Sequence, residues 1–310
     1  MTAKRIGLMF AGQGAQAVGM AADIARQEPA AEQLFDVADK TLDMNISEVC
    51  FKGPLETLTE SRYCQPAIYT TSLACLAALQ VHCPIEPVVC GGLSLGEFAA
   101  LQAGGVFAFD DGLELGAARG RLMQEACRGT DGAMAAVLNA DSALVEKVCA
   151  DHDIDVANLN CPGQLVISGP RGGISEAVNS LKEAGVSRVI MLEVDGAFHS
   201  RLMAPAAESF RPVLDAVPMH PPRCAVVQNY AGTTVYQPAD IKDNLARQIT
   251  GSVRWEDCVH AMLEQNPDLL IELGPGKVLS GFMRRIDKKF PICNVSSMDD
   301  LQTACEAIQS

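Results

Sequence analysis

The chain has 310 residues, of which 48% are hydrophobic and 20% are charged, a balance that indicates a globular protein with a large domain and a smaller one. Its formal net charge of −14 argues against a nucleic-acid partner, because phosphates would be repelled. No apolar run reaches the roughly eighteen residues of a membrane span, so we expect no membrane partner.

The first part of the chain alternates short apolar runs with helical patterns, which predicts an α/β fold. We expect a buried strand at Ile6–Phe10, followed at once by a loop at Ala11–Gln16. Helical patterns then occupy much of 20–82, and Pro87–Gly92 predicts a second strand. A turn that contains glycine follows each of these two strands.

Ser94 lies in the pattern Gly-Leu-Ser-Leu-Gly, which matches the G-x-S-x-G of a nucleophile turn. Such a serine sits on a sharp bend between a strand and a helix, so its neighbours must be small. The context agrees, because a strand precedes the turn and a helical pattern starts at Glu97. We expect the backbone N–H of Leu95 and a donor from the turn at Gly12–Gly14 to stabilise an oxyanion. The alternative is an ordinary turn, in which a serine between small residues has no chemical role.

A helix is expected at Asp110–Arg128, with Asp110 or Asp111 as its N-cap. Apolar residues recur along one face of this helix, and Arg119 falls within that apolar stripe. An inward-facing guanidinium keeps its charge and needs an anion. That anion is either an internal carboxylate or a substrate carboxylate held by two parallel hydrogen bonds.

Residues 131–196 predict an inserted small domain, because strands and helices alternate in the β-α-β-β-α-β order of the ferredoxin-like arrangement. The expected elements are strand Met134–Leu138, helix Asp141–Ala150, strands Asp155–Leu159 and Leu165–Ser168, helix Gly173–Ala184 and strand Arg188–Val194. Residues 1–130 and 197–310 then form the large α/β domain, with a further strand at Asp268–Leu273.

A serine hydroxyl needs a base to take its proton, and His199 is the best candidate among the five histidines. It comes just after the last predicted strand of the small domain, and loops at strand ends often carry chemistry. A structural histidine with satisfied hydrogen bonds is the alternative. The five histidines show no metal-ligand spacing, so we expect no metal site and no cofactor.

Several motifs in fixed order resemble those of the malonyl-CoA:acyl carrier protein transacylases, a family that includes acyltransferase domains of polyketide synthases. The resemblance runs nearly end to end. It is carried by the segments 10–16, 92–97, 118–124, 158–164, 196–199, 253–255 and 272–276, with Gln248 before the sixth. The implied fold is a hydrolase-like α/β large domain that carries a ferredoxin-like insertion, which agrees with the division inferred above.

This resemblance implies an acylated nucleophile at Ser94, with His199 as its base. It also implies that Gln13 and Leu95 supply backbone donors to the oxyanion. Arg119 would bind the free carboxylate of a malonyl group.

By the same resemblance, the backbone carbonyl of Gln248 would orient the catalytic histidine in place of an aspartate. Leu93, Asn160 and Phe198 would line the acyl pocket. Most family members have histidine at the position of Leu93, so the resemblance carries no inference about polar contacts beside the acyl group here. Phe198 resembles the loop of malonyl-selective members more than the methylmalonyl version.

The implied reaction moves malonyl from coenzyme A to the phosphopantetheine thiol of acyl carrier protein, for fatty acid synthesis. The alternatives are a trans-acting acyltransferase of polyketide synthesis, an acyl-thioester hydrolase that uses water, and a non-catalytic module that docks carrier proteins. Since the chain is acidic, an acidic partner must dock on a local basic patch, and 284–289 is the best candidate.

Twelve cysteines are scattered through apolar segments without a C-x-x-C pair, which favours reduced core thiols. The N-terminal segment lacks the apolar stretch and cleavage site of a signal peptide. We therefore expect a cytoplasmic protein.

Overall fold

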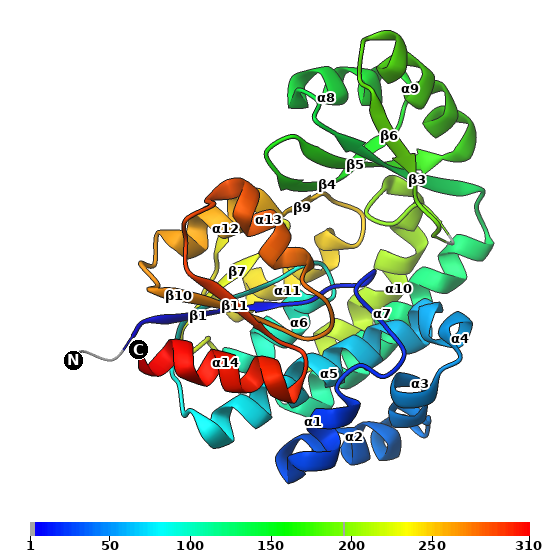
Figure 1. Cartoon of the computed structure of the whole chain (residues 1–310). Coiled ribbons are helices and arrows are strands. Elements are labelled where there is room, and N and C mark those ends of the chain that lie inside the picture. The colour runs from blue at the N-terminus through cyan, green and yellow to red at the C-terminus, as the bar shows by residue number, and fades with distance from the viewer. Residues whose placement is uncertain (1–3, 195) are drawn as a thin grey trace.

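The structure is a computed structural model, and it describes residues 4–194 and 196–310. Within this part of the chain, the strands form a six-stranded and a five-stranded sheet. Figure 1 shows the larger sheet in the middle of the molecule and the smaller one, with α8 and α9, at its upper end. The small domain predicted from the sequence ends at residue 196. Residue 195, just before that boundary, lies outside the described residues.

The large sheet is mostly parallel, with strand order β11-β10-β1-β2-β7-β8. Five neighbouring strands run in the same direction, and only β8 pairs antiparallel. Its strands are β1 (Ile6–Phe10), β2 (Pro87–Gly92), β7 (Ala225–Gln228), β8 (Thr233–Thr234), β10 (Leu269–Leu273) and β11 (Ile292–Val295). The carboxyl ends of β1, β2 and β7 therefore meet at one edge of the sheet, where α/β enzymes place their sites.

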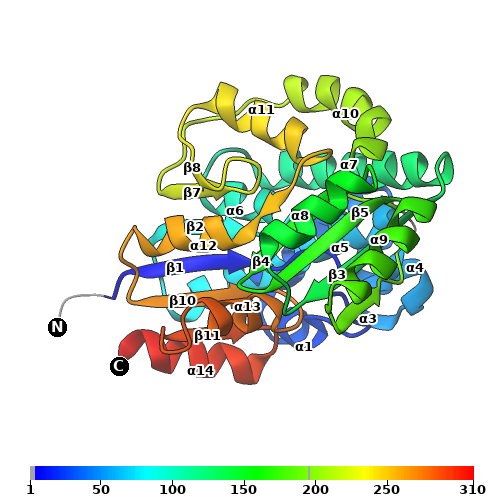
Figure 2. The ribbon, with the colours of Figure 1, turned by 90° about the horizontal axis from the view of Figure 1, so that it is seen from above.

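Helices cover both faces of the large sheet (Figure 2). Ile6, Leu8 and Phe10 of β1 belong to one apolar core, whereas Met9 belongs to a second core on the opposite face. The first core includes residues of α5 to α7, and the second includes residues of α12 and α13. The helices outside the small sheet's segment are α1 (Ala22–Gln27), α2 (Pro29–Leu42), α3 (Ile46–Lys52), α4 (Leu55–Thr59), α5 (Ser61–His82), α6 (Gly96–Ala103), α7 (Phe109–Arg128), α10 (Ala204–Ala216), α11 (Pro238–Gln248), α12 (Trp255–Leu263), α13 (Val278–Ile286) and α14 (Met298–Gln309), with a short 3₁₀ turn, η1, at Arg201–Met203.

The small sheet has the ferredoxin-like order expected from the sequence, with one addition. Its strands lie in the order β6-β3-β5-β4-β9, and the first four pair antiparallel. The elements are β3 (Gly132–Leu138), α8 (Ser142–Asp151), β4 (Asp155–Cys161), β5 (Gln164–Pro170), α9 (Arg171–Glu183), β6 (Arg188–Met191) and β9 (Val253–Arg254). The addition is β9, which comes from outside 131–196 and pairs parallel with β4. The division of the chain into two domains at 131 and 196 stays a prediction.

The strands at Ile6–Phe10 and Pro87–Gly92 are confirmed with the bounds expected from the sequence. The N-cap expected for α7 is wrong, because the helix begins at Phe109 and its N-cap is Ala108. Asp111 instead stands at the third helical position, where its carboxylate accepts the backbone N–H of Ala108 at 3.4 Å. The last small-sheet strand ends at Met191 rather than Val194.

Nine of the twelve cysteines are buried, and no disulfide is formed within the described residues. Among the residues described, no helix is both long and apolar enough to span a bilayer. No cluster of three or more His, Cys, Asp or Glu side chains in the described segments could hold a metal ion.

Candidate active site

The tight turn between β2 and α6 places Ser94 in the left-handed region, with φ of 51°. This turn needs its flanking glycines for steric reasons. A Cβ atom on Gly92 would lie 2.0 Å from the backbone of Gly96, and a Cβ atom on Gly96 would lie 2.2 Å from the carbonyl oxygen of Phe10. The G-x-S-x-G pattern thus reflects close backbone contacts between β1, β2 and α6.

The hydroxyl of Ser94 lies beside the imidazole of His199, with Oγ 2.8 Å from Nε2. The other ring nitrogen, Nδ1, is 2.8 Å from the backbone oxygen of Gln248. A carbonyl oxygen only accepts, so Nδ1 carries the proton and Nε2 is left to accept from the serine. Gln248 is the last residue of α11, and its carbonyl is free for this contact because it lies in the final helical turn.

His199 is held as a neutral base. Burial, together with the positive charge of Arg119, lowers the pKa of the imidazole from 6.5 to about 4. Its side chain is only slightly exposed, and its φ of 55° marks a strained turn. At neutral pH the ring is therefore ready to take a proton from Ser94.

Arg119 lies on the buried face of α7, as its place in the apolar stripe predicted, and is 1% exposed. Its guanidinium donates to Gln65 Oε1 at 2.8 Å, to Gln248 Oε1 at 3.0 Å and to Ser94 Oγ at 3.0 Å. Within 4–194 and 196–310 it forms no ion pair with a carboxylate, and its Nε has no partner. Burial lowers the pKa of Arg119 to about 10, so it stays charged at neutral pH.

A buried cation that forms no ion pair with a carboxylate of the described residues, and that is directed at the serine hydroxyl, is the pattern expected of a site that binds an anionic substrate. An internal ion pair, the alternative left open by the sequence, is not found among the described residues. The geometry favours the substrate carboxylate as the missing partner.

The two predicted oxyanion donors belong to segments next to Ser94 in the chain and in the pocket. Leu95 follows it directly at the start of α6, and Gln13 lies in the turn after β1, beside Ser94 in the same pocket wall. Neither backbone N–H has a hydrogen-bond acceptor among the described groups. The Gln13 side chain is held by Ser61 Oγ at 3.0 Å and by the amide of Gln65 at 3.3 Å. Their role as oxyanion donors stays a prediction.

Ser94 opens into a pocket of about 400 Å³ between the large sheet's loops and the small sheet. The predicted pocket residues Leu93, Asn160 and Phe198 all line it. Asn160 is 5% exposed and its Oδ1 has no partner among the residues described, so this oxygen is available to a ligand. The Leu93 side chain adds an apolar wall next to the nucleophile.

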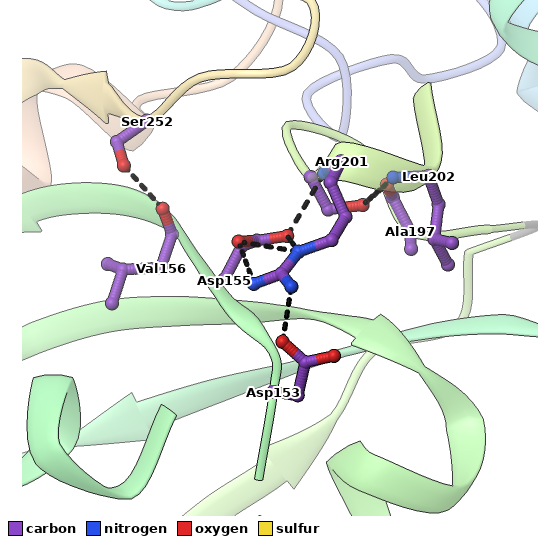
Figure 3. Close-up of polar contacts among 8 residues, drawn as sticks. Asp153, Asp155, Val156, Ala197, Arg201, Leu202 and Ser252 are labelled. Atoms are coloured by element: carbon purple, nitrogen blue, oxygen red, sulfur yellow. Dashed lines mark hydrogen bonds and ion pairs between the residues drawn. The ribbon is translucent and has the colours of Figure 1, made fainter. Parts of the chain in front are cut away.

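Hydrogen bonds and ion pairs connect the loop that carries His199 to the small sheet (Figure 3). Asp155, at the start of β4, accepts the backbone N–H of Arg201 at 3.0 Å and its guanidinium at 3.0 Å. Arg201 also pairs with Asp153, and Ser252 Oγ donates to the backbone oxygen of Val156. These contacts join the segment after the histidine to one wall of the pocket.

Three polar residues of the site were missed as functional residues by sequence reasoning. Asn229 accepts the backbone N–H of Ser94 at 2.6 Å and donates to the carbonyl of Gly92 at 2.8 Å, so it supports the turn. Gln65 accepts a hydrogen bond from Arg119, and Glu97 accepts one from the side chain of Gln248. The available signal was a polar side chain inside an otherwise apolar helix or directly after a buried strand, which does not reveal a partner far away in sequence.

The expected docking residues lie at the end of α13 and directly after it. Arg284, Arg285, Lys288 and Lys289 are all exposed, and Arg285 donates to the carbonyl oxygen of Pro162 at 2.8 Å. They belong to, or directly follow, α13, whose first turns contribute Val278 and Phe282 to the pocket wall.

Comparison with known proteins places this architecture among acyl-transferring enzymes. Residues 8–298 match the family model described as the acyl transferase domain. The chain is 39% identical, over 98% of both chains, to the malonyl CoA-acyl carrier protein transacylase of Bacillus subtilis. The structure of the Coxiella burnetii malonyl CoA-acyl carrier protein transacylase superposes with a TM-score of 0.96 at 29% identity, covering 99% of each chain. A malonyl-transacylase solved in complex with a type II PKS acyl-carrier protein superposes with a TM-score of 0.94 at 33% identity, covering 98% of this chain and 99% of that one.

Proposed function

The chain belongs to the acyl transferase family, and from this membership and the site geometry we propose that it transfers malonyl from coenzyme A to acyl carrier protein through an ester on Ser94. The observation that carries the proposal is the position of one hydroxyl. Ser94 Oγ lies 2.8 Å from a neutral imidazole and 3.0 Å from an arginine that has no ion-pair partner among the residues described. A nucleophile, its base and an anion-binding group thus meet at one point.

In the first half-reaction, Ser94 Oγ attacks the thioester carbonyl while His199 Nε2 takes its proton. The carbonyl oxygen becomes negative, and the backbone N–H groups of Gln13 and Leu95 stabilise it. When the C–S bond breaks, the imidazolium returns the proton to the departing coenzyme A sulfur. The malonyl group is left as an ester on the serine.

The second half-reaction runs the same steps in reverse order with a new thiol. The phosphopantetheine sulfur of the carrier protein gives its proton to His199 and attacks the ester carbonyl. The C–O bond to Ser94 breaks, and the serine oxygen recovers a proton from the imidazolium. No net proton is consumed, so the site is unchanged after each cycle.

Arg119 supplies the selectivity in this proposal. It binds the free carboxylate of the malonyl group and thereby fixes the thioester carbonyl near Ser94. Neutral acyl groups lack this contact, and their thioesters would react more slowly. The pocket also provides the Oδ1 of Asn160, which has no partner among the described residues, and the apolar surfaces of Leu93 and Phe198.

The carrier protein is proposed to dock on the basic patch formed by Arg284, Lys288 and Lys289. This patch adjoins α13, which forms part of the pocket wall, so a thiol on a flexible arm could reach Ser94 from there. The thiol has the same chemistry in carrier proteins of fatty acid and polyketide synthesis. We propose fatty acid synthesis as the pathway, and competition between the two kinds of carrier protein tests that choice.

Intact-mass measurement tests the acyl-enzyme directly. Incubation with malonyl-CoA should add the mass of one malonyl group to the wild-type protein, and the Ser94→Ala variant should show no adduct. A matched control is Ser200→Ala, because that hydroxyl lies next to His199 but donates to Ala197 O, and its adduct should persist. An unmodified wild-type protein would end the proposal, and free malonate released as fast as carrier protein is loaded would favour a hydrolase.

A further inference from the structure

A carboxylate is buried directly beneath the nucleophile turn and takes no part in the chemistry described so far. Glu97, in the first turn of α6, is 0% exposed and does not line the pocket. It accepts hydrogen bonds from the backbone N–H of Asn229 at 2.7 Å, from Gln228 Nε2 at 2.9 Å and from Gln248 Nε2 at 2.9 Å. In the described part of the chain it has no ion-pair partner, so these three neutral donors hold the buried group.

The contact with Glu97, together with those to Ser94 O and Asn229 Oδ1, sets how the side-chain amide of Gln248 is oriented. A carboxylate only accepts, so it draws the NH₂ end of the amide toward itself. The oxygen end then faces Arg119 and accepts from its Nη2 at 3.0 Å. The same NH₂ group also donates to the backbone oxygen of Ser94 at 3.1 Å. If the amide were reversed, its NH₂ group would face the N–H groups of Arg119, and no hydrogen bond could form between them.

Gln248 therefore links the anion at Glu97 to the cation at Arg119. Burial raises the pKa of Glu97 to about 7, and the positive charge of Arg119 is among the causes that oppose this rise. The two groups therefore interact inside the protein. The backbone oxygen of Gln248 in turn holds the imidazole of His199. Gln248 thus contacts both His199 and Arg119, and Glu97 holds its side chain.

We propose that Glu97 is a positioning residue for malonyl transfer, which orients the Gln248 amide so that Arg119 is held in place to receive the malonyl carboxylate. The inference rests on the proposed function. Glu97 acts through Gln248 and does not touch the substrate, so it is not itself a catalytic residue. A purely structural reading is that Glu97 only ties α6 to β7 through Gln228 and Asn229. The two readings differ in their effect on substrate selectivity.

Replacing Glu97 by glutamine keeps the shape but sets an amide, with a single oxygen acceptor, against three donors. We expect the ratio of malonyl to acetyl loading rates in the Glu97→Gln variant to fall by about 10-fold or more, because Arg119 loses its fixed orientation. The control is Gln228→Leu, which removes another donor to Glu97 but leaves the amide of Gln248 in place. Its ratio should stay within about 2-fold of the wild type. Equal loss of malonyl and acetyl loading in Glu97→Gln would mean that Glu97 is structural.

A double-mutant cycle tests the route through Gln248. Once Gln248→Met has removed the amide, adding Glu97→Gln should change the loading ratio by less than about 2-fold further. If the two effects simply multiply, Glu97 does not act through Gln248 and the inference fails. Should Glu97→Gln not fold, as judged by its thermal midpoint, Gln248→Met alone must still lower the ratio, and an unchanged ratio refutes the inference. A wild-type protein that takes up no malonyl would instead refute the proposed function.

Discussion

Replacing Arg119 by alanine should lower malonyl loading far more than acetyl loading. The side chain is 1% exposed and three of its N–H groups are engaged by Gln65, Gln248 and Ser94. The contact with Ser94 Oγ is the one that a bound malonyl group would replace once the serine becomes an ester. The variant removes both the charge and the paired donors that a carboxylate needs.

The size of the effect follows from the hydrogen bonds that the malonyl carboxylate would no longer receive. Each hydrogen bond to a charged group contributes about 1.5–3 kcal/mol, so removing two costs about 3–6 kcal/mol. This corresponds to a decrease of roughly 10²- to 10⁴-fold in the rate of malonyl loading. Acetyl has no carboxylate, and its loading should fall by about 10-fold or less, because the unpaired oxygens of Gln65 and Gln248 only loosen the site.

The assay is loading of the intact protein with malonyl-CoA or acetyl-CoA at matched concentrations, followed by mass over time. Arg121→Ala is the matched control, because Arg121 lies two residues away on α7 but is exposed and paired with Glu125. It should leave both rates unchanged, and Arg119→Lys should fall between wild type and Arg119→Ala because lysine keeps the charge without the paired donors. A similar loss for both acyl groups in Arg119→Ala would refute the assignment and make Arg119 a structural residue.

Three further predictions follow from the geometry. The rate of acetyl loading should stay constant from about pH 7.5 down to about pH 5.5 and fall only toward pH 4. The reason is that burial and a neighbouring positive charge lower the pKa of His199 to about 4. A rate profile with its midpoint at pH 6.5 would contradict this prediction. Glutamate at both Arg284 and Lys288 should raise KM for carrier protein but not for a small thiol acceptor, and unchanged kinetics would move the docking patch elsewhere. Gly116→Ala should raise the free energy of unfolding by up to about 1 kcal/mol, since helix α7 has room for the methyl group there. Gly120→Ala should lower it, because the new Cβ would lie 2.3 Å from a backbone oxygen of α5, and urea unfolding of the pair checks whether the signs differ.

The features that the sequence predicted well are those encoded locally. The strand Pro87–Gly92 and the turn at Ser94 carry their own steric signature, because glycines are required where backbones approach closely. The small sheet was predicted from the order of its elements, and the buried face of α7 from periodicity, which placed Arg119 correctly. These inferences need only neighbours within a few residues.

The features that were missed depend on contacts between distant segments. The two-residue strand β9 joins the small sheet through a pairing with Asn158 and Leu159 about a hundred residues earlier, and nothing in its own composition indicates this. The support that Glu97 gives to Gln248 spans more than 150 residues. The cap of α7 was misplaced because a carboxylate near a helix start can serve from the cap or from the third position.

The absence of an acidic partner for His199 in the described site has a physical explanation in the neighbouring arginine. A carboxylate against Nδ1 would raise the pKa of the imidazole and would also attract Arg119, whose charge the proposed substrate needs. The backbone carbonyl of Gln248 fixes the same tautomer without adding charge, and the negative group, Glu97, is kept below the turn behind the Gln248 amide. A base that stays neutral and a cation that stays available for a substrate carboxylate can therefore lie within about 3 Å of one hydroxyl. The backbone carbonyl and the arginine thus meet one requirement of the proposed reaction, which needs a neutral base next to a cation that is free to bind a carboxylate.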